Sequence, residues 1–158
     1  MLFRSLWASP STIGGRQWDP ALGLRVATEL PSTWSIEVYG ARASPSGGNA
    51  YASTATTRML FGVRGGRWLY DQGGLLALQA AGGLSASLSS TRYALRDVGG
   101  DPQAVEGSSG LKLAPELGAS LRLRPFKLLE LRLDASALYR DARIEALVGL
   151  SLGVWVAF

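Results

Sequence analysis

The amino-acid sequence predicts an all-β fold, an antiparallel up-and-down transmembrane β-barrel of about eight strands. Three observations predict it. Apolar residues recur at every second position along several segments, and the segments between them have loop or turn composition. The polar positions lack the dense lysine, glutamate and asparagine of a soluble surface. Because 158 residues is the length of one domain, residues 1–158 are expected to form a single barrel.

The clearest alternation lies in the last third of the chain. Every even position from residue 144 to residue 158 is apolar, and the odd positions are mostly small or polar. Residues 129–140 and 111–124 repeat this two-residue period, which is the period of a strand with one apolar face. A helix is the competing interpretation, because leucine, alanine and glutamate favour helices. The leucines of residues 128–138 would spread around a helical cylinder without forming a stripe, so strands are predicted.

Shorter segments upstream carry weaker copies of the pattern. Apolar residues alternate along residues 76–88, 58–64, 34–38 and 22–29. Residues 2–8 alternate over a brief run and are expected to form one more strand. With the C-terminal segments, these runs give seven predicted strands, or eight with the first one.

The connections alternate between long and short, as expected for hairpins with loops at one rim and turns at the other. The long segments of loop composition are residues 9–20, 44–53 and 96–110. The tighter turns are residues 29–32, 65–74 and 124–127. A short turn at residues 141–142 falls on the loop side as an exception.

The polar face of the strands predicts which side of the barrel meets lipid. This face mixes glycine, alanine and serine with isolated charges of both signs, which suits a narrow lumen and leaves the apolar face outside. With simple hairpin pairing around the turn at Pro125, Arg122 faces Glu130. In the same register, Ser120 faces Arg132.

A network of charged residues is expected to line this lumen. Its members are Arg25, Glu29, Glu37, Arg58, Arg64, Glu116, Arg122, Arg124, Glu130, Arg132 and Asp134. Such a set could line an ion path or a binding pocket. A plug of mutually neutralising ion pairs is favoured, because eight strands leave a lumen about wide enough for side chains only.

The chain ends on an aromatic residue that follows apolar residues at alternate positions. These residues are Leu150, Leu152, Val154, Val156 and Phe158. The pattern resembles the C-terminal strand signature of bacterial outer-membrane β-barrel proteins, and among small members it is most similar to the eight-stranded OmpA transmembrane-domain and OmpX type. The resemblance implies insertion in a bacterial outer membrane with a periplasmic C-terminus. It also implies that the barrel-assembly machinery reads these residues as an assembly signal.

The start of the chain lacks the signal peptide that is usual in this family. Residues 1–158 are therefore expected to be a mature form or the C-terminal part of a longer chain.

The absence of histidine and cysteine excludes most catalytic and metal sites. Without imidazole or thiol the sequence has no Ser-His-Asp triad, no cysteine nucleophile and no His or Cys metal ligand. Residues 149–153 match the nucleophile elbow of esterases, but Ser151 lies in an alternating strand and has no histidine partner. The enzymes of the resembled family use a histidine, so we expect a non-enzymatic protein with no cofactor and no metal.

The net charge of +4 comes from 16 basic and 12 acidic residues. The arginines are scattered singly along the chain and form no run, so no nucleic-acid partner is expected.

Aromatic residues near the predicted strand ends are expected to form the interfacial girdles of a membrane barrel. They are Trp18, Trp34, Trp68, Tyr70, Phe126 and Tyr139. The acidic residues Asp97, Asp101 and Glu106 match no calcium-loop spacing and are expected to be solvated.

The predicted function is a structural, anchoring or surface-interaction role in the outer membrane. The expected partners are outer-membrane lipid along the apolar strand faces, the barrel-assembly machinery at the C-terminal strand, and a surface ligand at the long loops. Two alternatives stay open. One is the C-terminal part of a larger porin-like barrel that forms a diffusion pore, and the other is a soluble lipocalin-like barrel that binds a small ligand.

Overall fold

The computed structural model describes residues 2–11, 17–30, 33–44, 46–48, 52–72, 75–95, 103–126, 129–140 and 142–154. Within these ranges no helix has the length and apolarity needed to span a membrane. The nine strands are β1 (Leu2–Ser11), β2 (Gln17–Glu29), β3 (Trp34–Ala43), β4 (Ser46–Gly48), β5 (Ala52–Gln72), β6 (Leu76–Leu95), β7 (Gln103–Phe126), β8 (Leu129–Arg140) and β9 (Arg143–Val154).

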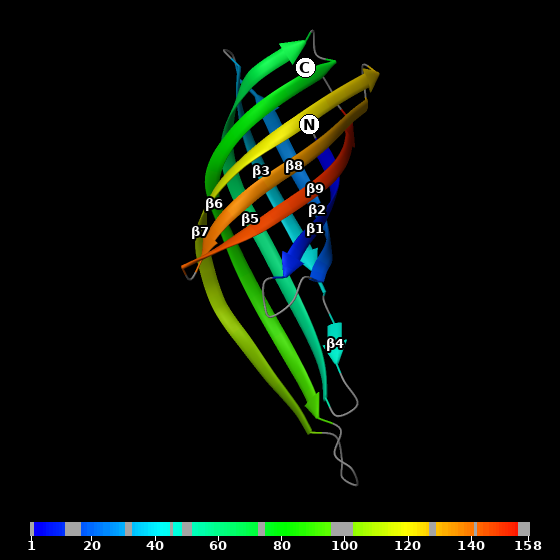
Figure 1. Ribbon diagram of the computed structural model, residues 1–158, viewed down its shortest axis with the longest axis vertical. Helices are drawn as coiled ribbons and strands as arrows, with labels where there is room; N and C mark the ends of the chain where they lie inside the picture. The colour runs from blue at the N-terminus through cyan, green and yellow to red at the C-terminus, as the bar shows by residue number, and fades with distance from the viewer. Residues whose placement is uncertain are drawn as a thin grey trace.

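The strands form one antiparallel sheet that closes on itself. Its order is β3-β2-β1-β9-β8-β7-β6-β5-β4, and β3 also pairs with β5, so only β4 lies outside the ring and the other eight strands complete it. The first and last strands meet in register from Leu2 opposite Val154 to Ala8 opposite Val148. The predicted up-and-down barrel of about eight strands is confirmed, including the short first strand (Figure 1).

The start of β1, the end of β9 and the β2–β3, β5–β6 and β7–β8 connections share one rim of the barrel, which we call the turn rim, and the opposite rim is the loop rim. β5, β6 and β7 have 21, 20 and 24 residues, against 10 to 13 for the other ring strands. Their excess length extends beyond the loop rim together with β4 (Figure 1). We call this extension the projecting sheet; it consists of β4 with residues 52–57, 89–95 and 103–111.

The projecting sheet corrects the predicted loop boundaries. Parts of the expected loops at 44–53 and 96–110 are strand. At the turn rim, outside the projecting sheet, the expected turn at 65–74 is also strand up to Gln72. None of the side chains described in the projecting sheet is buried, so both of its faces can be polar and its sequence carries little alternation. Backbone pairing holds it together, from Ala52 opposite Leu95 onward.

The predicted register of the β7–β8 hairpin is wrong by two residues. Arg122 lies opposite Arg132, and Ser120 lies opposite Asp134. The strands extend to Phe126 and Leu129, which pair with each other, so the hairpin closes after Pro125 and not around it. The register also shifts between Leu123 and Phe126, and sequence alternation alone cannot detect such an irregularity.

Burial in the barrel is inverted relative to a soluble protein. Along β3 the apolar residues Trp34, Ile36 and Val38 are about half exposed, whereas Ser35 and Glu37 are 2% and 1% exposed. The largest fully buried side chains are mostly charged: Arg25, Arg64, Arg122, Arg132, Leu138, Gln79, Glu37, Glu116, Glu130 and Asp134. The predicted facing therefore holds, with apolar residues on the outside and polar residues in the lumen.

Close packing of the lumen requires small residues at specific positions. Tyr39 lies opposite Gly62 on the neighbouring strand, and its side chain is buried in the lumen. A Cβ built on Gly62 would overlap the Tyr39 ring. A Cβ on Gly66 would overlap the amide of Gln79 in the same way. Glycine at these positions lets two large polar side chains enter a lumen that eight strands make narrow.

Candidate functional site

The middle of the lumen holds three arginines and three carboxylates, which we call the central ion cluster. Its members are Arg25, Glu37, Arg64, Glu116, Arg132 and Asp134, and each is 1% or 2% exposed. They come from β2, β3, β5, β7 and β8. Glu37 and Arg64 already lie opposite each other on neighbouring strands, and the closed ring brings the more distant strands to them. Their formal charges cancel, three positive against three negative, which is the arrangement that makes charge burial tolerable.

Asp134 is the most connected carboxylate of the cluster. Its Oδ2 lies 2.8 Å from Nη1 of Arg25, and its Oδ1 accepts hydrogen bonds from Nη2 of Arg64 at 2.8 Å and Nε of Arg132 at 3.1 Å. The Ser120 hydroxyl donates to the same Oδ1 at 2.6 Å. Three guanidinium groups therefore share this one carboxylate as a partner.

The other two carboxylates, Glu37 and Glu116, also contact arginines of the cluster. Glu37 accepts from Nε of Arg64 at 2.7 Å, and its Oε1 lies 2.5 Å from Nη2 of Arg132. Glu116 lies 3.5 Å from Nη1 of Arg64 and accepts a hydrogen bond from the hydroxyl of Tyr39. Arg64 therefore contacts all three carboxylates of the cluster.

Neutral polar side chains complete the cluster, and of these the sequence prediction missed Gln79 and Ser35. Gln79 accepts from Nη2 of Arg132 at 2.5 Å through its Oε1 and donates through its Nε2 to the hydroxyl of Ser35. Ser120 also accepts from Nη2 of Arg132, at 2.8 Å. These residues share the inward-facing alternate positions of their strands, and that parity is the signal that could have identified them.

A second group of charges lies toward the turn rim. Arg122 stacks over the ring of Trp68, with its Cζ 3.9 Å from the ring centroid, and pairs with Glu29 and, at 3.1 Å, with Asp71. Arg124 bridges Glu29 at 3.2 Å and the buried Glu130 at 2.7 Å.

Trp68 is 9% exposed and faces the lumen, so its prediction as a girdle residue is wrong. Trp68 lies four residues after Arg64 in β5, and side chains an even number of residues apart point to the same face of a strand. The Trp68 side chain therefore points into the lumen. Trp34, Tyr70, Phe126 and Tyr139 are exposed, whereas the side chain of Trp18 lies outside the described residues.

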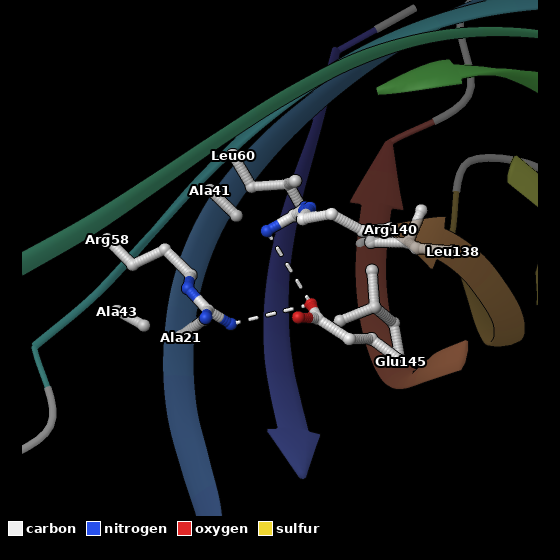
Figure 2. Close-up of a pocket in the computed structure, with 9 residues that line it drawn as sticks. Ala21, Ala41, Ala43, Arg58, Leu60, Leu138, Arg140 and Glu145 are labelled. Atoms are coloured by element: carbon white, nitrogen blue, oxygen red, sulfur yellow. Dashed lines mark ion pairs between the residues drawn. The ribbon is translucent and has the colours of Figure 1, made fainter. Parts of the chain in front are cut away.

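An apolar layer separates the central ion cluster from the loop rim. It is a contiguous cluster of buried residues: Ala21, Tyr39, Ala41, Ala43, Leu60, Ala114, Leu138 and Leu147. Above it Arg58 and Arg140 both approach the carboxylate of Glu145, at 3.6 and 3.7 Å, around a small cavity (Figure 2). Arg58 therefore lies apart from the other residues of the expected lumen network, and its partners Arg140 and Glu145 were not anticipated.

The remaining sequence features fall in different places. Leu150, Leu152 and Val154 of the expected assembly signal face outward on β9, and Val156 and Phe158 lie outside the described residues.

Ser151 is buried in mid-strand and donates to the backbone carbonyl of Arg132 at 3.4 Å, a structural role with no nucleophile geometry. Glu106 pairs with Arg92 on the surface of the projecting sheet, and Asp97 and Asp101 lie outside the described residues.

Neither a protein-family model nor a curated protein matches the sequence. Solved structures do match its fold. Ail, the attachment invasion locus protein of Yersinia pestis, in complex with the heparin analogue sucrose octasulfate, superposes with a TM-score of 0.64 at 11% identity over 97% of this chain and 94% of Ail. The N-terminal β-barrel domain of Pseudomonas aeruginosa OprF gives 0.64 at 11% identity over 97% and 95% of the two chains. Neisserial surface protein A gives 0.62 at 15% identity over 99% and 95%.

These likenesses confirm the fold that the C-terminal pattern implies, a small outer-membrane β-barrel of the OmpA and OmpX type. The inverted burial agrees with it, because an apolar outer wall around a charged interior is stable in lipid and not in water. Fold and outer wall together indicate a β-barrel whose outer surface faces lipid.

Proposed function

We propose that this protein is a non-enzymatic outer-membrane barrel whose lumen is plugged by its own side chains and whose projecting sheet acts as a surface-interaction module. The observation that carries the plug is the burial of eight charged side chains to 1% or 2% exposure within one ring of strands: Arg25, Glu37, Arg64, Glu116, Arg122, Glu130, Arg132 and Asp134.

Burial of this depth disfavours a conducting path. An ion crossing the barrel would have to displace guanidinium groups from carboxylates that lie 2.5 to 3.1 Å away. Separating a buried pair costs about 3–5 kcal/mol, and each arginine of the central ion cluster has more than one carboxylate partner. The apolar layer above the cluster adds a second barrier to a hydrated ion.

The bilayer experiment separates a plugged barrel from a pore. The full chain is refolded in detergent and added to a planar phospholipid bilayer, where we expect no stepwise conductance above background. A stable single-channel current from the unmodified protein would overturn the plug and favour an open, conducting lumen.

The projecting sheet supports the surface-interaction role. Long connections of outer-membrane barrels face outward from the cell, which places this sheet outside. Among the described strands, β7 has a neighbour on only one side along residues 103–115, because its pairing with β8 begins at Glu116. An unpaired strand edge can accept an extended segment of a partner. We infer that outer-membrane lipid is a partner, because the outer wall of the barrel is apolar. We also propose that the barrel-assembly machinery recognises β9.

The ligand class is tested with a sulfated sugar, since Ail was solved with a heparin analogue. Bacteria that display the protein are passed over heparin-coated beads, and we expect retention that falls with added salt. The matched control lacks residues 91–107. Ser90 and Ser108 already lie opposite each other in the β6–β7 hairpin, so a two-residue Asn-Gly turn can join them. Equal retention of both proteins would overturn the role of the projecting sheet.

A further inference from the structure

The loop-rim end of the lumen contains a small cavity that the plug does not use. Its walls are the alanines at positions 21, 41 and 43, Leu60, Leu138 and Leu147, and its charged lining consists of Arg58, Arg140 and Glu145. Six members of the apolar layer line this cavity, which lies on the loop-rim side of the central ion cluster. Figure 2 shows both guanidinium groups directed toward the carboxylate of Glu145.

The charges around the cavity do not balance. Two arginines share one glutamate, which leaves one formal positive charge among the described residues that line it. Both ion pairs are long, at 3.6 and 3.7 Å, and neither is close enough for a hydrogen bond. In the central ion cluster, by contrast, every arginine has at least one carboxylate partner at 2.5 to 2.8 Å.

Arg140 supplies the second observation. It is 8% exposed, and its Nε is a buried donor without a hydrogen-bond partner. A buried donor left unsatisfied costs free energy, and for a charged group the cost is larger than for a neutral one. An acceptor placed in the cavity would remove this cost and compensate the excess charge at the same time.

We propose that this cavity binds one monovalent anionic group, a carboxylate, between Arg58 and Arg140. The cavity volume is about 30 Å³, which admits about two water molecules or one carboxylate group. A dianion such as sulfate would exceed the single uncompensated charge and would lose its hydration against apolar walls. Arg58 and Glu145 have side chains 25% and 16% exposed, so the carboxylate can reach the site from solvent.

The experiment is a titration of the refolded, isotope-labelled protein in detergent, followed by the NMR signal of the arginine Nε–H groups. Acetate and the carboxylate end of the peptide Gly-Gly are the two anionic probes, and acetamide and sulfate are the neutral and dianionic comparisons. We expect a saturable shift of the Arg140 Nε–H signal with one or both carboxylates. Tighter binding of acetate indicates a free small acid, and tighter binding of the peptide indicates the end of a larger molecule.

Two kinds of variant test the assignment. Arg140→Gln removes the donor and the charge, and we expect carboxylate affinity to fall at least about tenfold. Ala43→Leu fills the cavity without changing any charge, and we expect loss of binding with the fold retained, judged by gel mobility before and after boiling. Arg92→Gln, on the exposed projecting sheet, should leave the affinity unchanged.

An equal shift with acetamide would mean that the cavity holds water or any polar molecule, and would overturn the proposal. Unchanged binding in Ala43→Leu would overturn it as well. Neither result bears on conductance, so this site and the plug are tested independently.

Discussion

Replacing Asp134 with asparagine tests whether the central ion cluster stabilises the barrel. The change keeps the size of the side chain and removes one negative charge, so three arginines face two carboxylates in a site where every member is 1% or 2% exposed. The close contacts to Arg25, Arg64 and Arg132, at 2.8 to 3.1 Å, lose their compensation together. Breaking a buried pair costs about 3–5 kcal/mol, and we expect a loss of this size in the free energy of unfolding.

The measurement is reversible urea unfolding of the refolded protein in phospholipid vesicles, followed by tryptophan fluorescence. With a slope of about 1–3 kcal/mol per molar urea, the midpoint should fall by at least about 1 M. The matched control is Glu106→Gln, which breaks the ion pair with Arg92 at side-chain exposures of 63% and 67%. Because exposed pairs contribute about 0–1 kcal/mol, the control midpoint should barely move.

A double variant separates electrostatics from packing. Adding Arg25→Met to Asp134→Asn restores the balance, with two arginines facing two carboxylates, so part of the lost stability should return. If the stability lost by the double variant, relative to the unmodified protein, equals the sum of the losses of the two single variants, the cluster acts by packing alone. If Asp134→Asn and Glu106→Gln lose the same amount, the electrostatic reasoning is refuted.

Three further substitutions test other parts of the structure. Leu152→Arg on the outer wall should lower the free energy of unfolding in vesicles by about 2–4 kcal/mol, and a negligible change would contradict its lipid-facing position. Gly62→Val should cost at least about 1–3 kcal/mol in the same assay because its side chain overlaps Tyr39, whereas Gly110→Val, with nothing within 4 Å, should be neutral. Trp68→Ala should cost about 3–5 kcal/mol as a buried aromatic, and an interfacial position would make the loss smaller.

The sequence predicts the ring strands well and the projecting sheet poorly, for one physical reason. β9 has lipid on one side and lumen on the other, so Leu150 and Leu152 alternate with Ser151 and the period is visible. The end of β5 near Ala52 has no buried side chain on either face, and backbone pairing alone imposes no alternation.

The lumen was harder to predict because its contacts cross the ring. Arg64 and Asp134 lie 70 positions apart, and nothing local to either residue identifies the other as its partner. Arg140 continues the inward parity of Arg132 and Asp134, so its direction could have been predicted. Its pairing with Glu145 depends on the tight turn before β9, where Ala142 adopts a positive φ of 59°.

The pairing of β1 with β9 also sets the order in which this protein can fold. Leu2 meets Val154, so the ring closes only when both ends of the chain are present and adjacent. Contacts between residues so distant in sequence form slowly, since the entropy of closing a long loop must be overcome first. Until closure, Arg25 on β2 and Asp134 on β8 stand on separate arcs of an open sheet, each without its partner. The ion pairs that join these two arcs are therefore acquired in a single late step, which makes an open barrel short-lived and a closed one slow to unfold.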